Sequence, residues 1–416
     1  MEYRLNLLLF ASLLSYCLAH SMFKKLILFL VISFQCFLGV AQNAGLSPRS
    51  ELSLLTVGTG EALASKFGHS AIRLQDPSLG IDEVYGYGTY NFEDPNFYLN
   101  FVRGKLDYTI TRYPYKYFER SYILEKRWIK EQKLELNLNQ RKAIIAFLET
   151  NLLPQNRFYK YDFLFENCAT KIPEVFEKNL GNGLHFDFNY LDNQFTFRQL
   201  IHQNLNVNSW SNFGIDLALG SVIDRKATPY EHLFLPEYVY QQLKHTTLDG
   251  SPLVKETSVL LDIPTQKNNT LFILTPVFWL SVLLALVLYI SYKDYVRKNR
   301  SKWLDIFLFL TTGLAGLLIL FLWFFTDHLA TKINFNSLWA FAPNLIIAFY
   351  LFKKQLPKWL KVYISIAIAL LLLSVVLWLL KIQMFSILLC FILLALLVRY
   401  MFLLYYLRAS ENQIIK

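Results

Sequence analysis

The composition of the chain changes abruptly after residue 270, and this change limits the possible folds more than any other feature of the sequence. Five apolar runs follow, at 271–291, 303–326, 338–352, 359–380 and 384–407. Four of them are long enough to cross a hydrocarbon core of ~30 Å as helices. The run at 338–352 is short and contains Pro343 and Asn344. We therefore predict an all-α membrane domain of about five helices over residues 267–416.

Basic residues between the apolar runs predict the orientation of this domain. The loop after the first run and the loop after the third run hold Lys293, Arg297, Lys298, Arg300, Lys302, Lys353, Lys354, Lys358 and Lys361. Loops rich in Lys and Arg stay in the cytoplasm, so the C-terminus is predicted to be cytoplasmic and the part before residue 267 to be exported. The net charge of +10 is then partly an orientation signal, and we expect no nucleic acid partner.

The N-terminus supports the same orientation. Lys24 and Lys25 follow a second methionine, Met22, and precede an apolar stretch at 26–38 and small residues near Ala41. This pattern is typical of a signal peptide. We interpret residues 1–41 as a leader, with the signal peptide at 22–41 and the mature chain beginning near residue 42.

Residues 42–266 have the composition of an ordinary globular domain. Short alternating or β-rich stretches occur at 52–57, 70–74 and 84–90. A helical period follows at 140–153 and ends at Pro154. These patterns predict an exported α+β domain.

Cys168 is the only cysteine expected in the exported domain, because Cys17 and Cys36 lie in the leader and Cys390 lies in the last apolar run. No two cysteines have metal-ligand spacing, so we expect no metal site and no cofactor. An unpaired thiol in an exported domain is either buried and inert or kept because it reacts.

The residues around Cys168 favour reactivity. Asn167 is suited to cap a helix, which would place the thiol in a first turn, where backbone N–H groups stabilise a thiolate and lower its pKa. Pro173 restricts this argument to the first turn.

A nucleophilic cysteine needs a base, and His69 is the best placed of the histidines. It follows Gly68 and begins a predicted strand, on the same face as Ala71 and Arg73. A histidine in such a position can also be an ordinary core residue. The next strand carries Gly86 and Gly88 on one face, which leaves room for a ligand or for a neighbouring backbone. A strained edge or a bulge of the sheet would account for these glycines equally well.

The sequence around these residues resembles known protein families. The order of His69 and Cys168, each at the start of an element, is similar to the circularly permuted papain-like fold. Five further stretches resemble the Lnb family of bacterial lipoprotein N-acyltransferases: 54–58, 87–92, 97–104, 161–163 and 214–220. The membrane domain that follows matches the layout of that family.

The resemblance implies a two-step acyl transfer at the surface of the bacterial inner membrane, with the catalytic domain in the periplasm. Cys168 would take an acyl chain from a phospholipid as a thioester, with His69 as general base. The acyl group would then pass to the α-amino group of a diacylated lipoprotein. Asn167 and Tyr87 are further candidates for orienting the site or binding an oxyanion.

Two other functions remain open. A membrane-anchored cysteine peptidase or amidase of the cell envelope would need Cys168 and His69 but not the membrane spans. A non-catalytic membrane scaffold would need neither side chain.

Overall fold

The structure, a computed structural model, describes residues 45–90, 93, 95–264 and 270–414. Contacts divide the chain into two units, residues 1–49 and residues 50–416. The predicted leader and its signal peptide lie outside the described residues. The fold below is that of the unit at 50–416.

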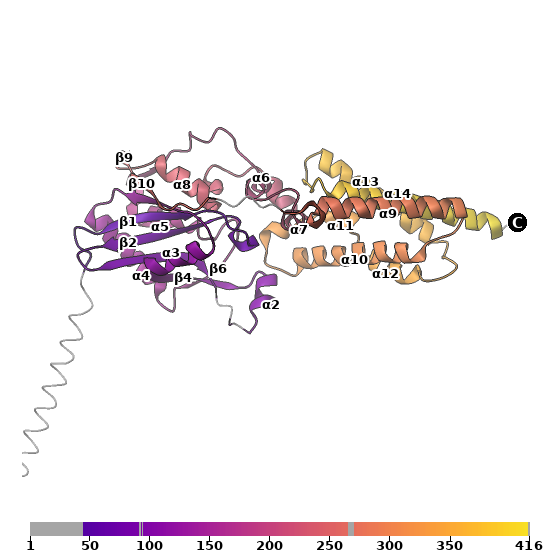
Figure 1. Ribbon diagram of the computed structural model, residues 1–416, viewed down its shortest axis with the longest axis horizontal. Coiled ribbons are helices and arrows are strands. Elements are labelled where there is room, and N and C mark those ends of the chain that lie inside the picture. Colours follow the sequence, from indigo (N-terminus) through magenta and orange to yellow (C-terminus); the bar gives the residue numbers. More distant parts are fainter. Residues whose placement is uncertain (1–44, 91–92, 94, 265–269, 415–416) are drawn as a thin grey trace, which may run out of the picture. The chain divides into compact units, whose positions relative to one another are not determined.

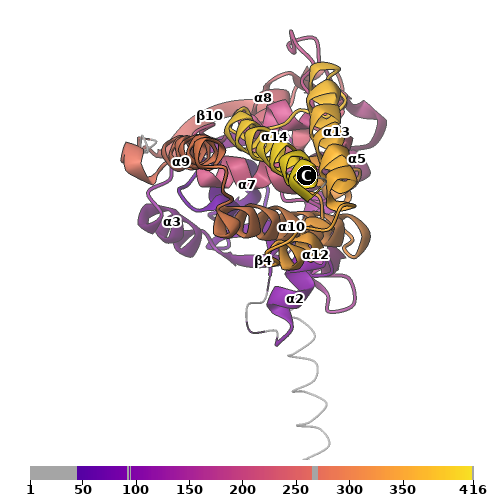
Figure 2. The same ribbon diagram turned by 90° about the vertical axis from the view of Figure 1, so that its right-hand side faces the viewer.

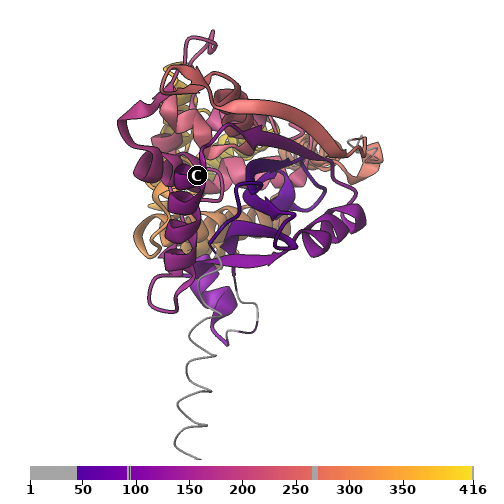
Figure 3. The same ribbon diagram turned by 90° about the vertical axis from the view of Figure 1, so that its left-hand side faces the viewer.

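The exported part is built on a sheet of seven antiparallel strands (Figures 1 and 3). Their order across the sheet is β10-β5-β1-β2-β3-β4-β6. In chain order they are β1 (Glu51–Val57), β2 (His69–Asp76), β3 (Ile81–Thr89), β4 (Asp107–Pro114), β5 (Ile129–Leu134), β6 (Phe158–Lys160) and β10 (Val254–Leu261). The strands predicted at 52–57, 70–74 and 84–90 are confirmed as β1, β2 and β3.

Helices cover both faces of this sheet. Tyr115 and Phe118 of α3 (Tyr115–Leu124) pack against Val84 and its neighbours on one face. Successive strand residues point to opposite faces, so the side chain of Tyr85 reaches the other face, where it donates a 2.6 Å hydrogen bond to Glu149 of α4. This helix, α4 (Leu138–Leu152), confirms the helix predicted at 140–153. The centre of the sheet is therefore buried on both sides.

Smaller elements complete the exported part. The helices are α2 (Phe97–Val102), α5 (Lys171–Leu180), α6 (Phe197–His202), α7 (Trp210–Ala218) and α8 (Pro236–Lys244). A second, three-stranded sheet is formed by β7 (Leu184–Phe186), β8 (Thr246–Leu248) and β9 (Ser251–Pro252). The exported part is thus an α+β domain, as predicted.

The C-terminal part is a helical bundle, seen along its axes in Figure 2. Four of its helices are long and apolar enough to cross a membrane. They are α9 (Pro276–Arg297), α10 (Lys302–Phe324), α13 (Leu360–Leu379) and α14 (Leu389–Ile414). Four of the five predicted spans are therefore confirmed as helices of membrane-spanning length.

The remaining apolar run, at 338–352, differs from the prediction because it is not one continuous helix. It consists of α11 (Asn336–Trp339), a turn that contains Pro343, and α12 (Asn344–Tyr350). A proline in a helix removes a backbone donor and clashes with the preceding turn, which accounts for the break. The broken segment lies against α10, where Gly313 and Gly316 have no side chain to obstruct its backbone.

The broken segment nevertheless runs along α10 from one end of the bundle to the other. Its first end lies beside the exported part, where Nδ2 of Asn336 donates a 3.0 Å hydrogen bond to the carbonyl oxygen of Asp216. Its other end lies beside the loop between α9 and α10, where Nη2 of Arg300 donates to the carbonyl oxygen of Leu351 at 2.9 Å. The segment therefore covers the distance that a fifth span would cover.

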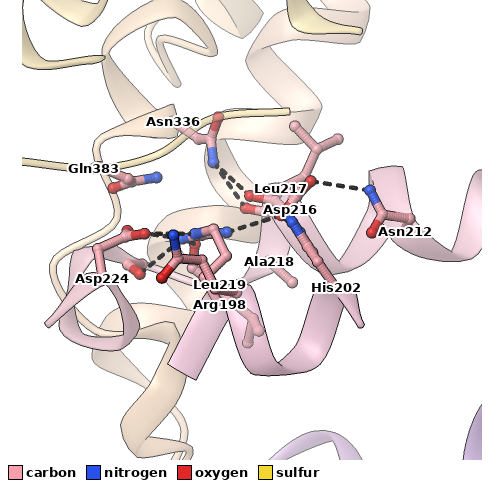
Figure 4. Close-up of polar contacts among 12 residues, drawn as sticks. Arg198, His202, Asn212, Asp216, Leu217, Ala218, Leu219, Asp224, Asn336 and Gln383 are labelled. Carbon is pink, nitrogen blue, oxygen red and sulfur yellow. Dashed lines mark hydrogen bonds and ion pairs between the residues drawn. The ribbon is translucent and has the colours of Figure 1, made fainter. Parts of the chain in front are cut away.

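A buried polar cluster, the Arg198 cluster, lies where the exported part meets the bundle (Figure 4). Arg198 is 2% exposed and donates to the carboxylates of Asp216 and Asp224 at 2.9 and 2.8 Å. The same Asp216 carboxylate contacts Nε2 of His202 at 2.8 Å. Nδ2 of Asn334, from the bundle side, donates to the carbonyl oxygen of Leu217 at 2.8 Å. These contacts join α6 and α7 to the segment that precedes α11.

Candidate functional site

A cavity with a volume of about 540 Å³ lies between the sheet domain and the segment that follows α10. We call it the Cys168 cavity, because Cys168 and His69 both line it. Most of its wall is apolar and comes from Leu63, Phe67, Leu106, Phe163, Ile201, Ile215, Leu219 and Phe234. Residues 327–331, which follow α10, close one side. The fold therefore places a thiol and an imidazole in an apolar space next to the membrane bundle.

Asn167 shapes the turn that carries the thiol. Its side-chain oxygen accepts hydrogen bonds from the backbone N–H groups of Ala169 and Thr170, at 2.7 and 3.0 Å. Its side-chain nitrogen donates to the carbonyl oxygens of Phe163 and Phe234, at 2.7 and 2.9 Å. Both ends of the amide are thus engaged with the backbone, and Asn167 holds Cys168 in place.

The helix after Cys168 begins later than the sequence predicted. The helix α5 starts at Lys171, so Cys168 lies in the preceding turn and not in a first helical turn. Pro173 then falls within the first turn, where a missing N–H group breaks no helical hydrogen bond. The side chain of Asn167 caps the turn, and the helix begins four residues later, at Lys171.

The expected lowering of the thiol pKa is also corrected. Burial raises the pKa of Cys168, while the backbone N–H groups of Ser70, Cys168 and Ala169 and the charge of Arg127 act in the opposite direction. The resting thiol is therefore protonated at neutral pH and needs a base to become a nucleophile. The same N–H groups lie where they could stabilise an oxyanion beside the sulfur.

His69 is the first residue of β2 and can act as that base. Burial, and after it the positive charge of Arg127, lower the pKa of His69 to about 4. The imidazole is therefore neutral at pH 7 and free to accept a proton. Gly68 precedes it with φ +82°, and a Cβ there would come within 2.7 Å of the carbonyl oxygen of Val57. Only glycine can adopt this conformation so close to the backbone of Val57.

The two glycines of β3 face the candidate catalytic pair. A Cβ at Gly86 would lie 3.6 Å from Nε2 of His69, and a Cβ at Gly88 would lie 3.7 Å from Cβ of Cys168. Both residues are therefore bordered by bare backbone. The pairing of β3 with β4 also shifts in register between Gly86 and Thr89, so the strand is irregular here as well. A reacting group has room to enter between His69, Cys168 and β3.

Tyr87 lies elsewhere. Its hydroxyl accepts a 2.7 Å hydrogen bond from Nδ2 of Asn151 in α4, and burial raises its pKa to about 12. It is not among the residues that line the Cys168 cavity. The structure brings together Cys168, His69 and Asn167, and it places Tyr87 on the opposite face of β3.

Arg127 is a site residue that the sequence analysis missed. It is 5% exposed, and its charge acts on both His69 and Cys168. Its Nε donates a 2.7 Å hydrogen bond to the carbonyl oxygen of Gly58, 69 residues away. No local motif marks this arginine, because its position depends on the pairing of β1 with β5.

Two family models match the chain. Residues 46–203 match the Lnb N-terminal periplasmic domain, and residues 266–410 match the Lnb transmembrane domain. No curated protein and no solved structure matched. The two matches follow one another in the order of the exported part and the bundle described above. The chain is therefore a membrane protein with a periplasmic domain, and it belongs to the Lnb family.

Proposed function

We propose that this protein is a lipoprotein N-acyltransferase of the bacterial inner membrane, with its catalytic domain facing the periplasm. The observation that carries the proposal is the Cys168 cavity, where a thiol and a neutral imidazole share an apolar space bordered by the membrane bundle. Its volume falls within the range of about 300–1,000 Å³ that is usual for small-ligand sites. An acyl chain suits its walls better than a polar peptide does.

The first half-reaction transfers the acyl group to the protein. His69 takes the proton of the Cys168 thiol, and the sulfur attacks the ester carbonyl carbon of a phospholipid. A carbon–sulfur bond forms and the ester carbon–oxygen bond breaks. The proton held by His69 passes to the leaving oxygen, and a lysophospholipid departs.

The second half-reaction transfers the acyl group to the lipoprotein. The α-amino nitrogen of a diacylglyceryl cysteine attacks the thioester carbonyl, a carbon–nitrogen bond forms, and the carbon–sulfur bond breaks. His69 accepts a proton from the nitrogen and returns it to the Cys168 sulfur. The thioester divides one difficult acyl transfer into two easier ones.

Incubation of the purified chain with phospholipid alone tests this proposal. Mass spectrometry should find an acyl chain on Cys168, and a diacylated lipopeptide with a free amine should then discharge it to a triacylated product. Peptide cleavage with no acyl adduct on Cys168 would overturn the proposal in favour of a cysteine peptidase or amidase. Normal function of a Cys168→Ala chain in cells would instead indicate a scaffold.

A further inference from the structure

A second cavity, with a volume of about 590 Å³, adjoins the Cys168 cavity. The two share four lining residues, Ala64, Gly68, His69 and Tyr90. We call the second one the Arg127 cavity. The other residues that line it lie within 60–65 and 122–127. Among them are the charged residues Glu61, Glu125, Lys126 and Arg127. An apolar space and a charged space therefore meet at His69.

Arg127 lines this second cavity and has one unused donor. Its Nε is bound to the carbonyl oxygen of Gly58, and its Nη1 donates to the carboxylate of Glu125 at 2.8 Å. Its Nη2 is buried and has no hydrogen-bond partner among the described residues. A buried N–H group without a hydrogen-bond partner is costly, and an anion that accepts from Nη2 would remove that cost.

We propose that the Arg127 cavity binds the phosphate of the phospholipid acyl donor, with Nη2 of Arg127 as the principal donor to a phosphate oxygen. This inference rests on the proposed function and adds a subsite to it. The phosphate of a glycerophospholipid is attached to the same glycerol as the ester that Cys168 attacks. An anion site that shares His69 with the apolar cavity matches that arrangement.

The other amphiphiles of the reaction fit this arrangement less well. A fatty acid would place its carboxylate at Cys168 itself, and not beyond His69. The lipoprotein acceptor brings an amine, which is cationic when protonated and is repelled by Arg127. The carboxylates of Glu61 and Glu125 also line the cavity, but Glu125 is already paired with Nη1 of Arg127. Nη2 is therefore the donor of Arg127 that remains for a phosphate oxygen.

Protection of Cys168 from alkylation tests the inference without any turnover. The full chain is held in a phosphate-free sterol-based detergent, and iodoacetamide labelling of Cys168 is followed by mass spectrometry. An alkylphosphocholine and an alkyl glucoside of equal chain length are the two probes. Because a hydrogen bond to a charged group contributes about tenfold or more in affinity, the alkylphosphocholine should protect at about tenfold lower concentration than the glucoside.

The Arg127→Gln chain should lose this preference, while the glucoside protects it as well as it protects the wild type. Protection is expressed as a ratio within each chain, because Arg127 also affects the pKa of Cys168. Arg120→Gln is the matched control, since Arg120 is exposed and lines neither cavity, and it should keep the preference. Intact protection by the glucoside shows that the variant is folded.

Three results would overturn the inference. The first is an unchanged phosphocholine preference in the Arg127→Gln chain, and the second is equal loss of protection by both probes. The third is protection by inorganic phosphate alone at the same concentrations, which would indicate a site for free anions. None of these depends on acyl transfer, so a failure of the proposed function would be seen separately, as the absence of an acyl adduct.

Discussion

At the scale of single residues, Cys168 and His69 are expected to act as one unit. Replacement of either by Ala should reduce acyl transfer by at least ~10³-fold, and the double replacement should cost little more, because each residue is ineffective without the other. The measurement is triacylated lipopeptide formed per minute by the purified chains. Cys390→Ala is the control, since that thiol is exposed on α14 and should leave the rate within about twofold. Additive losses from Cys168 and His69 would contradict a shared role.

The pH dependence of the first half-reaction follows from the pKa of His69. That pKa is lowered to about 4, so the imidazole is a competent base above this value and becomes protonated as the pH falls through it. Acyl adduct formation on Cys168 should therefore keep its rate from neutral pH to about pH 5 and decline with a midpoint near 4. A quenched-flow series from pH 3.5 to 8 measures it. A midpoint near ~6.5, the ordinary histidine value, would show that burial does not shift His69.

The second half-reaction should lose rate at a higher pH. The acceptor is an α-amino group with an ordinary pKa of ~7.7–8.0, and only its unprotonated form attacks a thioester. Discharge of the acyl adduct should thus weaken below about pH 8, well before formation of the adduct does. A hydrolase that uses water has no amine acceptor, so its discharge rate would not fall below about pH 8 for this reason. The separation between the pH profiles of adduct formation and adduct discharge is therefore itself a test.

At the scale of elements, the Arg198 cluster is expected to stabilise the contact between the exported part and the bundle. Arg198→Met would leave the buried carboxylates of Asp216 and Asp224 without a counter-charge, which costs about 3–5 kcal/mol of unfolding free energy. Arg225→Met breaks an exposed pair with Glu231 and should cost under about 1 kcal/mol. Chemical unfolding of the purified full chain compares them. Equal stability of the two variants would show that the cluster does not stabilise the fold.

The broken segment packs closely against α10 at Gly316. A Cβ at Gly316 would collide with the backbone of Ala340, so Gly316→Ala should destabilise the bundle by about 1–3 kcal/mol. Gly214→Ala, in α7, meets no atom within 4 Å and serves as the matched control. Thermal unfolding of both chains in detergent measures the difference. A bundle unaffected by Gly316→Ala would mean that α10 and the turn after α11 do not pack this closely.

Elements that depend on local patterns were predictable from the sequence, and those set by distant contacts were not. The alternation at 52–57 and the helical period at 140–153 arise from neighbours in the chain, and both elements are present. The start of α5 differs from the prediction because Asn167 bonds to Phe234, 67 residues away, and caps a turn. No local pattern predicts Arg127 as a site residue, because the pairing of distant strands brings it to the site.

At the scale of the whole molecule, the packing of the unit at 50–416 agrees with the orientation that the basic loops predict. The exported part contacts the start of α9, where Nε1 of Trp210 donates to the carbonyl oxygen of Leu274 at 2.9 Å. It also contacts the segment before α11 through Asn334. Gln383, between α13 and α14, bonds to the same Asn334 at 3.1 Å. The loops rich in Lys and Arg meet at the other end, where Arg300 bonds to Leu351, so the exported part and the basic loops lie at opposite ends of one bundle.

From this arrangement we expect α2 to lie at the level of the membrane surface. Tyr98 and Leu99 of α2 are 79% and 55% exposed. The end of the helix is held by the segment after α10, where Nε2 of His328 donates to the carbonyl oxygen of Phe101 at 3.1 Å. Since α10 ends at Phe324, only a few residues separate this contact from a membrane span. An apolar helix face so close to the bilayer is expected to contact lipid.

A spin label on α2 measures this contact. With the native cysteines replaced by serine, a label at Tyr98→Cys should collide more often with oxygen, which concentrates in the bilayer, than with a water-soluble nickel chelate. A label at Leu79→Cys, 41% exposed in the turn between β2 and β3, provides the aqueous reference.

Phe101 of α2 also lines the Cys168 cavity. Contact of α2 with lipid would therefore place the wall of the cavity at the surface from which the acyl donor comes. If position 98 proves as accessible to the chelate as position 79, α2 does not touch the bilayer, and the donor must reach Cys168 by another side of the cavity.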